Sequence, residues 1–410
     1  MRRALVLISG CALSLMIACG GGGGTPTSNA GGNSITPATT NVAPLVVDPG
    51  PAGNYTNGLF VTVTVCVPGT ATCQNIDHVL VDTGSEGFRV LSSVLTLNLP
   101  QQTDATGNVI AQCNGFADGT FTWGPLASAD IQIAGEKASA VPIQVIGEAQ
   151  IPVPAACTGT DNDTVQTLEA NGIVGIGPFL QDCGSFCVTS VPSPAFYYTC
   201  SSTGCVGTVQ PLAAQLQNPV SMFTADNNGT IIELPGVSNS GAATVAGSLV
   251  FGIGTQSNNG LKGATPLAID PGSGTIATQF NGQQYSGTVI DSGSNGLFIL
   301  DAGTLGITTC PSPDDSFYCP GAPSTTALNQ RSLSAINFDS AGDQSTVNFS
   351  IANAEYLFGL NGGTNFAFNN LGGPNSGAFD WGLPFFYGRN VFTAIENQNT
   401  PIGTGPFYAY

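Results

Sequence analysis

Two copies of one short motif, one in each half of the chain, place an aspartate directly after an apolar run. Residues 82–85 read Asp-Thr-Gly-Ser and residues 291–294 read Asp-Ser-Gly-Ser. The runs before them, 79–81 and 288–290, predict buried strands, and the glycine in each motif tolerates the tight turn that exposes a carboxylate at a strand end. Two carboxylates brought together in this way can activate a water molecule for hydrolysis without a metal or a covalent intermediate.

The composition excludes several other kinds of chemistry. The 410 residues include 7 Lys+Arg against 25 Asp+Glu, a formal net charge of −18, and one histidine, His78. No basic surface is available for nucleic acid or for an anionic lipid surface. A Ser-His-Asp triad or a multi-histidine zinc site would have to use His78, which we interpret as an ordinary strand side chain. We therefore expect no metal site, no cofactor and no nucleic-acid partner.

The N-terminus has the pattern of an export signal. Arg2 and Arg3 precede an apolar run over residues 4–18, and Met-Ile-Ala-Cys at 16–19 is typical of a bacterial lipoprotein cleavage site. The pattern predicts a signal peptide over 1–18, lipid modification of Cys19 and a Gly/Ser/Thr/Pro-rich tether over 19–50. It also predicts an outer-membrane location on the periplasmic or the surface face. Cleavage as an ordinary signal peptide near Ala18 is the alternative.

Ten cysteines lie beyond that segment, and an even number in an exported chain predicts disulfides. Close spacing predicts three local pairs, namely Cys66–Cys73, Cys200–Cys205 and Cys310–Cys319. The remaining four can pair in three ways, between which the sequence does not choose: Cys113, Cys157, Cys183 and Cys187.

The pattern beyond residue 50 is predominantly that of a β-protein. Short runs rich in β-branched and aromatic residues alternate with turns of Gly, Asn, Pro and Ser. The clearest predicted strands cover residues 59–65, 129–133, 230–234 and 248–252. Two short helices are predicted, over 165–170 and 211–217. We divide this part into an N-terminal β lobe, 51–218, and a C-terminal β lobe, 219–410.

Beyond the two motifs, further segments resemble the pepsin-like (bilobal) aspartic proteases. They are the opening hairpin and first Asp strand (60–69 and 76–90), a flap-like hairpin (115–124), the Asn-Gly-Ile-Val-Gly-Ile-Gly segment (171–177), strands between the lobes (220–224 and 247–259) and a closing segment (381–395). The resemblance implies an all-β, two-lobed acid-protease fold of double-ψ β-barrel lobes with few short helices. The chain also resembles a proteobacterial lipoprotein family of unassigned function with that fold.

The resemblance also implies roles for single residues. Asp82 and Asp291 would be the catalytic pair. The supporting residues around it would be Thr83, Gly84, Ser85, Ser292, Gly293 and Ser294. Phe116 and Gly119 would lie on the flap and contact substrate, with Phe116 in place of that family's flap tyrosine. Arg89 stands where the family has a tryptophan, and Glu86 adds a further carboxylate.

We therefore expect a monomeric, lipid-anchored aspartic endopeptidase that acts on peptide or protein substrates. Two alternatives remain open. One is a catalytically inactive lipoprotein of the same fold that binds peptides or cell-envelope components. The other is a structural or adhesive β-rich surface lipoprotein, in which the two Asp motifs are only turns. The distance between the Asp82 and Asp291 carboxyls separates the last alternative from the others.

Overall fold

The computed structural model describes residues 35–148, 150–321 and 327–410, and in these residues the fold is all-β. Strand β2 (Gly58–Cys66) shows why. Its sequence, Gly-Leu-Phe-Val-Thr-Val-Thr-Val-Cys, is rich in β-branched residues that fit a pleated sheet, and almost all of its side chains are buried. The expected all-β class is therefore confirmed. The expected signal peptide and Cys19 lie outside the described residues.

Among the described residues, the largest sheet has 16 strands and runs through both halves of the chain. Its path in order is β11 (Gly204–Thr208), β10 (Tyr197–Ser201), β5 (Val109–Gly115), β6 (Thr120–Ile133), β7 (Glu136–Ile146), β4 (Glu86–Leu91), β9 (Gly172–Ile176), β3 (Cys73–Asp82), β2, β1 (Val42–Asp48), β13 (Val245–Phe251), β12 (Gly229–Leu234), β22 (Arg389–Ala394), β25 (Phe407–Ala409) and β14 (Pro266–Ala268), with β8 (Thr160–Asp161) beside β6.

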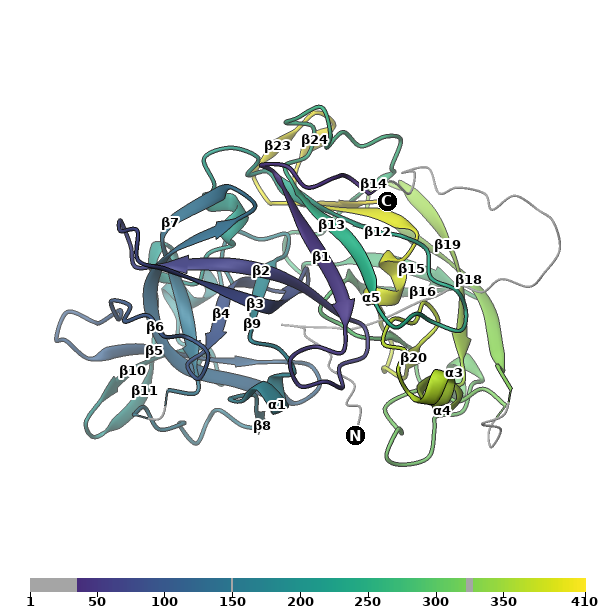
Figure 1. Cartoon of the computed structure of the whole chain (residues 1–410), viewed down its shortest axis with the longest axis horizontal. Helices are drawn as coiled ribbons and strands as arrows, with labels where there is room; N and C mark the ends of the chain where they lie inside the picture. Colours follow the sequence, from purple (N-terminus) through teal and green to yellow (C-terminus); the bar gives the residue numbers. More distant parts are fainter. Residues whose placement is uncertain (1–34, 149, 322–326) are drawn as a thin grey trace.

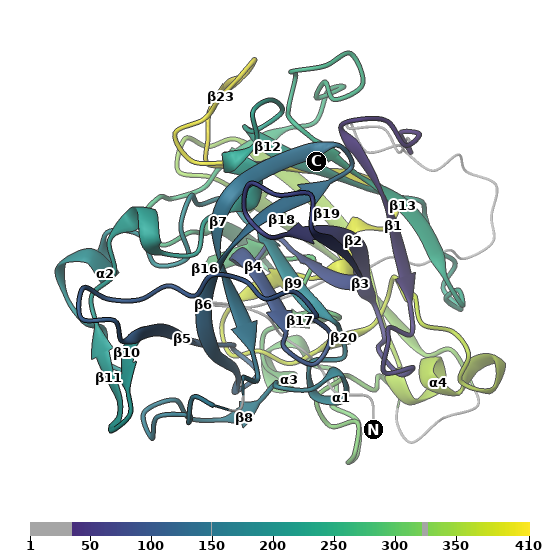
Figure 2. The same cartoon turned by 60° about the vertical axis from the view of Figure 1, so that its left-hand side comes forward.

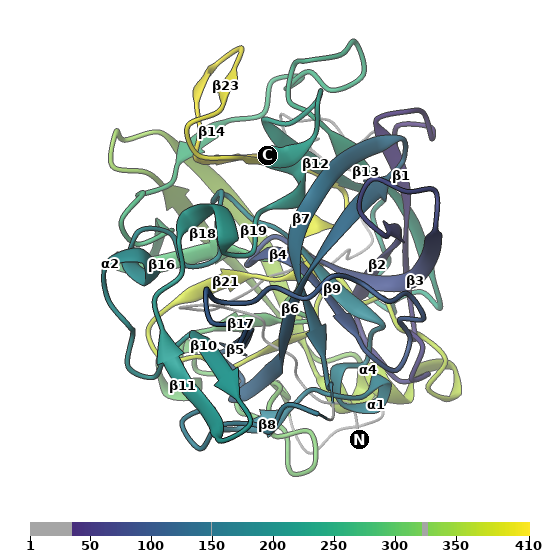
Figure 3. The same ribbon diagram turned by 90° about the vertical axis from the view of Figure 1, so that its left-hand side faces the viewer.

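A second sheet belongs to the C-terminal half alone. Its seven strands, counted within the described ranges, are in order β19 (Gln344–Ala352), β18 (Gln330–Phe338), β15 (Ile276–Phe280), β16 (Gln283–Ile290), β21 (Phe379–Trp381), β17 (Leu297–Ile299) and β20 (Gly372–Gly373). A small hairpin of β23 (Asn399–Thr400) and β24 (Gly403–Thr404) projects from the top of the molecule in Figure 3.

The helices are short. They are α1 (Val165–Leu168), α2 (Phe186–Thr189), α3 (Ala302–Leu305), α4 (Ala354–Gly359) and α5 (Leu383–Phe386), with 3-10 turns η1 (Leu212–Ala214), η2 (Pro219–Met222) and η3 (Leu360–Gly362). The helix expected at 165–170 is α1, and only a single 3-10 turn forms in the segment expected at 211–217. None of the helices described is long and apolar enough to cross a membrane.

Strand β1 joins the two halves of the molecule and corrects the predicted tether. It pairs antiparallel with β2 on one side and with β13 on the other. Figures 1 and 2 show it between the strands of the N-terminal half and those of the C-terminal half. The expectation of a tether as far as residue 50 is therefore wrong from Val42 onward. Leu45 and Val47 are buried in the core, so this segment gains apolar burial that a tether lacks.

The ten cysteines in the described part of the chain form five disulfides. The three predicted local pairs are confirmed: Cys66–Cys73, Cys200–Cys205 and Cys310–Cys319. Of the three pairings left open, the structure has Cys113–Cys157 and Cys183–Cys187. The Cys113–Cys157 bond links β5 to the loop that precedes β8.

Candidate active site

The two motif aspartates stand at the ends of strands with matching surroundings. Asp82 is the last residue of β3, and Asp291 directly follows β16. β3 pairs in parallel with β9, and β4, which follows the first motif, pairs antiparallel with that same β9. In the second half, β16 pairs in parallel with β21, and β17 pairs antiparallel with β21. The same local arrangement thus delivers each aspartate to the end of its strand.

The two motif loops are held together by reciprocal hydrogen bonds. The Ser292 N–H donates to Thr83 Oγ1 at 2.9 Å, and the Thr83 N–H donates to Ser292 Oγ at 3.2 Å. Each hydroxyl in turn donates across to the other strand, Thr83 to the Ile290 carbonyl at 2.9 Å and Ser292 to the Val81 carbonyl at 2.7 Å. All four bonds are buried, so the two loops form one rigid unit.

Each carboxylate is also held by its own loop. Asp82 Oδ1 accepts the Gly84 N–H at 2.8 Å, and its Oδ2 accepts the Ser85 hydroxyl. The same contacts recur in the second half. Asp291 Oδ1 accepts the Gly293 N–H at 2.7 Å, and its Oδ2 accepts the Ser294 hydroxyl at 2.9 Å. The motif residues predicted to support the pair are therefore the ones that position it.

Gly84 shows how closely the loops approach each other. A Cβ placed on this residue would lie 2.6 Å from Asp291 Cγ, a separation that real side chains do not show. Glycine is required here because the carboxyl of the opposite loop occupies the space where a side chain would stand.

The Asp82 and Asp291 carboxyls hydrogen-bond each other, and both are buried. Burial raises the pKa of Asp82, while the hydrogen bond from Ser85 and the charge of Arg89 oppose that rise. Burial and the charges of Asp82 and Asp380 raise the pKa of Asp291 well above its usual range. Two carboxylates in contact do not ionise together readily, so the pair shares one proton. This asymmetry favours the proton on Asp291 and leaves Asp82 ionised.

Glu86 and Arg89 belong to a buried polar network beside Asp82. The Arg89 guanidinium donates to the Glu86 carbonyl at 2.8 Å and to Asp182 Oδ2 at 3.3 Å. Burial raises the pKa of Glu86 to about 8 and that of Asp182 to about 6, although the Arg89 charge opposes both shifts. The sequence singled out Glu86 and Arg89, but it gave no signal for Asp182.

Tyr55 and Asp380 are two further residues near the pair that the sequence did not indicate. The Tyr55 hydroxyl lies 3.5 Å from the Gly293 carbonyl oxygen, and burial raises the pKa of this phenol well above its usual range. Asp380 lies on β21 and contacts Ser294. The one available signal for Asp380 was its place directly before the Trp-Gly of the closing segment.

Phe116 and Gly119 lie in the turn of the β5–β6 hairpin, where the Gly119 N–H donates to the Phe116 carbonyl at 3.1 Å. The Phe116 side chain is buried in an apolar cluster that includes Tyr55, Phe60 and Leu80. In this structure the ring therefore packs into the protein.

His78 lies on β3 with its two ring nitrogens 3.2 Å from carboxylate oxygens of Asp48 and Asp77. Across the described ranges, no group of three or more His, Cys, Asp or Glu side chains is arranged to hold a metal ion.

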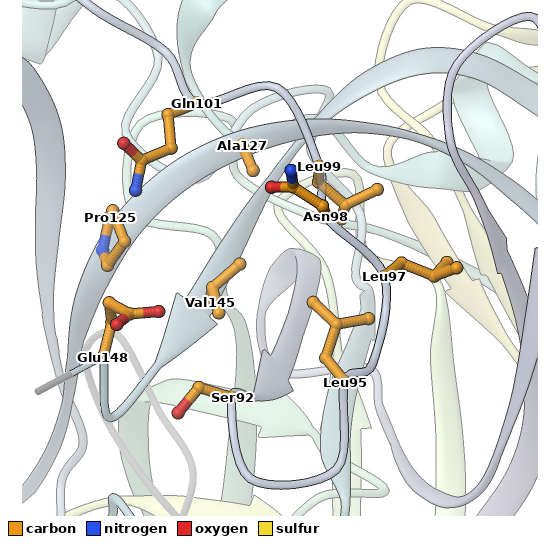
Figure 4. A pocket seen from close by; sticks show the side chains of 10 residues that line it. All are labelled: Ser92, Leu95, Leu97, Asn98, Leu99, Gln101, Pro125, Ala127, Val145 and Glu148. Carbon is orange, nitrogen blue, oxygen red and sulfur yellow. The ribbon is translucent and has the colours of Figure 1, made fainter.

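A separate hollow of about 320 Å³ lies on the N-terminal half (Figure 4). Leu95, Leu97 and Val145 line it together with polar residues, of which Glu148 carries the charge. A single carboxylate cannot form a pair of acid and base. Neither Asp82 nor Asp291, the two residues of the carboxyl dyad, lines this hollow.

No curated protein matches this chain. A family model described as "Protein of unknown function (DUF3443)" matches residues 37–410, a range that includes both motif loops and strand β1. The chain therefore belongs to this family.

Proposed function

We propose that this protein is an aspartic endopeptidase with a two-lobed, pepsin-like fold, which hydrolyses peptide bonds with water activated by Asp82 and Asp291. The observation that carries the proposal is the buried, hydrogen-bonded carboxyl pair at the junction of two interlocked loops. A turn of merely structural use has no need for two carboxyls in contact, because that contact costs free energy.

The proposed mechanism follows from the asymmetry of the pair. Ionised Asp82 takes a proton from water as the water attacks the scissile carbonyl, and protonated Asp291 transfers its proton to the carbonyl oxygen. The product of this step is a tetrahedral diol, with Asp82 now protonated and Asp291 ionised. The diol collapses when Asp82 gives its proton to the amide nitrogen and a diol hydroxyl returns a proton to Asp291, so the C–N bond breaks to give a carboxylic acid and an amine. The hydrogen bonds from Gly84 and Ser85 stabilise the negative charge on Asp82 before the reaction.

One observation favours the inactive alternative, in which the same fold binds peptides or cell-envelope components. Both dyad side chains are buried. A peptide reaches them for hydrolysis only after the residues that cover them move, whereas a protein that only binds peptides needs no contact between its ligand and the pair.

The test is hydrolysis of an unbiased peptide library from about pH 3 to 7 by the full-length protein, with and without a statine-type inhibitor. Asp82→Asn and Asp291→Asn are nearly isosteric, yet each removes the shared proton system. We expect each to lower the rate by about 10⁴-fold or more without loss of folding. Asp343→Asn, in the exposed turn between β18 and β19, is the matched control. A parent protein that cleaves nothing under these conditions would establish the inactive alternative.

We also propose that the protein is anchored to the outer membrane through a lipid on Cys19. Acyl chains contribute roughly 0.8 kcal/mol for each buried methylene, so a lipidated N-terminus holds the protein at the membrane. Cys19→Ala is expected to move the protein from the membrane fraction to the soluble fraction, or to block its maturation. Membrane association that persists in this variant would show that another part of the protein makes the attachment.

A further inference from the structure

A third buried carboxyl lies directly behind the pair, on the strand next to the one that leads to Asp291. Asp380 is the middle residue of β21, which runs parallel to β16. Its side chain is buried, and its Oδ2 lies 2.6 Å from the Ser294 hydroxyl oxygen. Within the described residues its Oδ1 has no hydrogen-bond partner.

A count of hydrogens shows how many protons the three carboxyls hold. Three hydrogen bonds connect the cluster: Asp82 to Asp291, Asp291 to Ser294 at 2.9 Å, and Ser294 to Asp380 at 2.6 Å. Ser294 supplies one hydrogen, and an ionised carboxylate supplies none. The other two bonds therefore need two carboxyl protons. One of them is the proton of the dyad. With the single Ser294 hydrogen given to Asp291, the second is a proton on Asp380, which then donates to Ser294 Oγ.

The surroundings of Asp380 favour its neutral form. Burial and the charge of Asp82 raise its pKa well above its usual range, and the hydrogen bond between Asp380 and Ser294 only partly opposes that rise. The titratable and charged groups that act on the cluster come from the two motif loops, β4, β25 and the segment between β1 and β2: Asp82, Asp291, Glu86, Arg89, Tyr408 and Tyr55. On the other side of β21, β17 presents apolar residues. Arg89 is the cation among these groups, and its charge stabilises ionised Asp82. No cation of this group stabilises an ionised Asp380 in the same way.

The N-terminal half builds the same loop without a third carboxyl. Val81 lies beside Val174 on β9, as Ile290 lies beside Trp381 on β21. The residue before Val174 is Ile173, so an apolar side chain stands at the position that corresponds to Asp380. A carboxyl is therefore not needed to form this strand arrangement, and its presence in one half calls for another explanation.

We propose that Asp380 is a positioning residue that stores a second proton beside the dyad and, through Ser294, extends to higher pH the range in which Asp291 stays protonated. The inference rests on the proposed function, because it concerns the pH range of that reaction. When Asp380 loses its proton in alkaline solution, its negative charge makes the loss of the Asp291 proton harder. Asp291 then stays protonated at a pH at which it would be ionised if Asp380 were absent.

The first experiment is the pH profile of peptide hydrolysis for the full-length protein and for Asp380→Asn. The amide of Asn can still donate to Ser294, but it carries no charge at any pH. We expect the alkaline limb to move to lower pH by about one unit, because the Asn variant removes the negative charge that would otherwise raise the pKa of Asp291. We expect the acid limb to stay in place. An alkaline limb that does not move would overturn the inference.

The second experiment needs no enzymatic activity. Infrared spectroscopy of the full-length protein with ¹³C-labelled aspartate counts protonated aspartates through their C=O stretching band. At about pH 8, Asp161 and Asp182, whose pKa values are raised to about 6, are ionised. We expect two protonated aspartates at this pH, and one after Asp380→Asn. A single protonated aspartate in the parent protein would overturn the inference.

The two readouts separate this inference from the proposed function. A protein that cleaves no peptide but shows two protonated aspartates, one of them lost in Asp380→Asn, supports the proton store and contradicts the protease. A protein that cleaves peptides but shows one protonated aspartate supports the protease and contradicts the proton store. Asp380→Leu, which resembles Ile173 of the other half, is expected to shift the alkaline limb in the same direction as Asp380→Asn.

Discussion

Glu86 illustrates at the scale of single residues how this protein tolerates buried acids with few cations nearby. Its Oε1 accepts one backbone hydrogen bond, from Phe179 at 3.1 Å, and it lies close to Asp82 and Asp182. Burial raises its pKa from 4.5 to about 8, so the folded protein holds this group protonated at neutral pH. Because the unfolded chain ionises it near its ordinary pKa, the stability contributed by this proton is present in acid and is lost as the pH rises through about 8.

This pH dependence of stability predicts how Glu86→Gln will behave. Gln stays neutral at every pH and keeps an oxygen for the Phe179 N–H. The variant should match the parent at about pH 4 and exceed its free energy of unfolding by up to roughly 4 kcal/mol at about pH 9. Denaturant unfolding at several pH values measures this difference, with the exposed Asp343→Asn as the control. A difference that does not grow with pH would show that Glu86 is ionised in the folded protein.

At the scale of elements, the site depends on strands that are themselves held by disulfides. The β5–β6 hairpin carries Phe116 at its turn, and Cys113 on β5 is bonded to Cys157, 44 residues further along the chain. Cys66–Cys73 closes only 7 residues, within the β2–β3 hairpin. A cross-link that closes a longer loop removes more freedom from the unfolded chain.

The two disulfides should therefore differ in what their removal costs. We expect Cys113→Ser with Cys157→Ser to lower the free energy of unfolding by about 4 kcal/mol, and Cys66→Ser with Cys73→Ser to lower it by about 2 kcal/mol. Equilibrium unfolding under non-reducing conditions gives both values. The reverse order would mean that native contacts around the bonds, rather than loop length, determine their contribution.

At the scale of the whole molecule, two features hold the halves against each other. Strand β1 continues the large sheet from β2 to β13. Asn57, just before β2, reaches into the C-terminal half. Its amide donates to the Asn295 carbonyl at 2.9 Å and to the Phe368 carbonyl at 3.0 Å, while its oxygen accepts the Phe368 N–H and the Tyr387 hydroxyl. All of these groups are buried, and each loses its hydrogen bond to Asn57 if that side chain is truncated.

Asn57→Gly isolates the contribution of this side chain, because glycine adopts the left-handed backbone of Asn57, with φ of 56°, without strain. We expect a loss of about 2 to 4 kcal/mol of unfolding free energy, since buried polar groups are left without partners. Asn281→Gly is the matched control, with φ of 51° in an exposed turn between β15 and β16. Equal losses in the two variants would show that backbone freedom, not the link between the halves, accounts for the effect.

Several features of the site were predictable from the sequence because they are encoded locally. A motif such as Asp82-Thr83-Gly84-Ser85 contains the aspartate and the glycine and serine that bind it, all within four residues. The all-β class follows from short β-branched runs between turns, and three disulfides follow from cysteines close together in the chain. In each case the interacting groups are neighbours in sequence, so the order of residue types describes the contact.

The tertiary structure alone decided which distant groups meet. Asp380 lies behind Asp291 because β21 pairs with β16, and Tyr55 reaches Gly293 because β1 and β2 bring the N-terminal segment against the other half. The Cys113–Cys157 pairing and the place of β1 in the sheet have the same origin. Which strands pair across long stretches of chain depends on how both halves bury their apolar faces together. No short stretch of sequence encodes that packing. The packing nevertheless places a third carboxyl, that of Asp380, beside the two that the sequence had indicated.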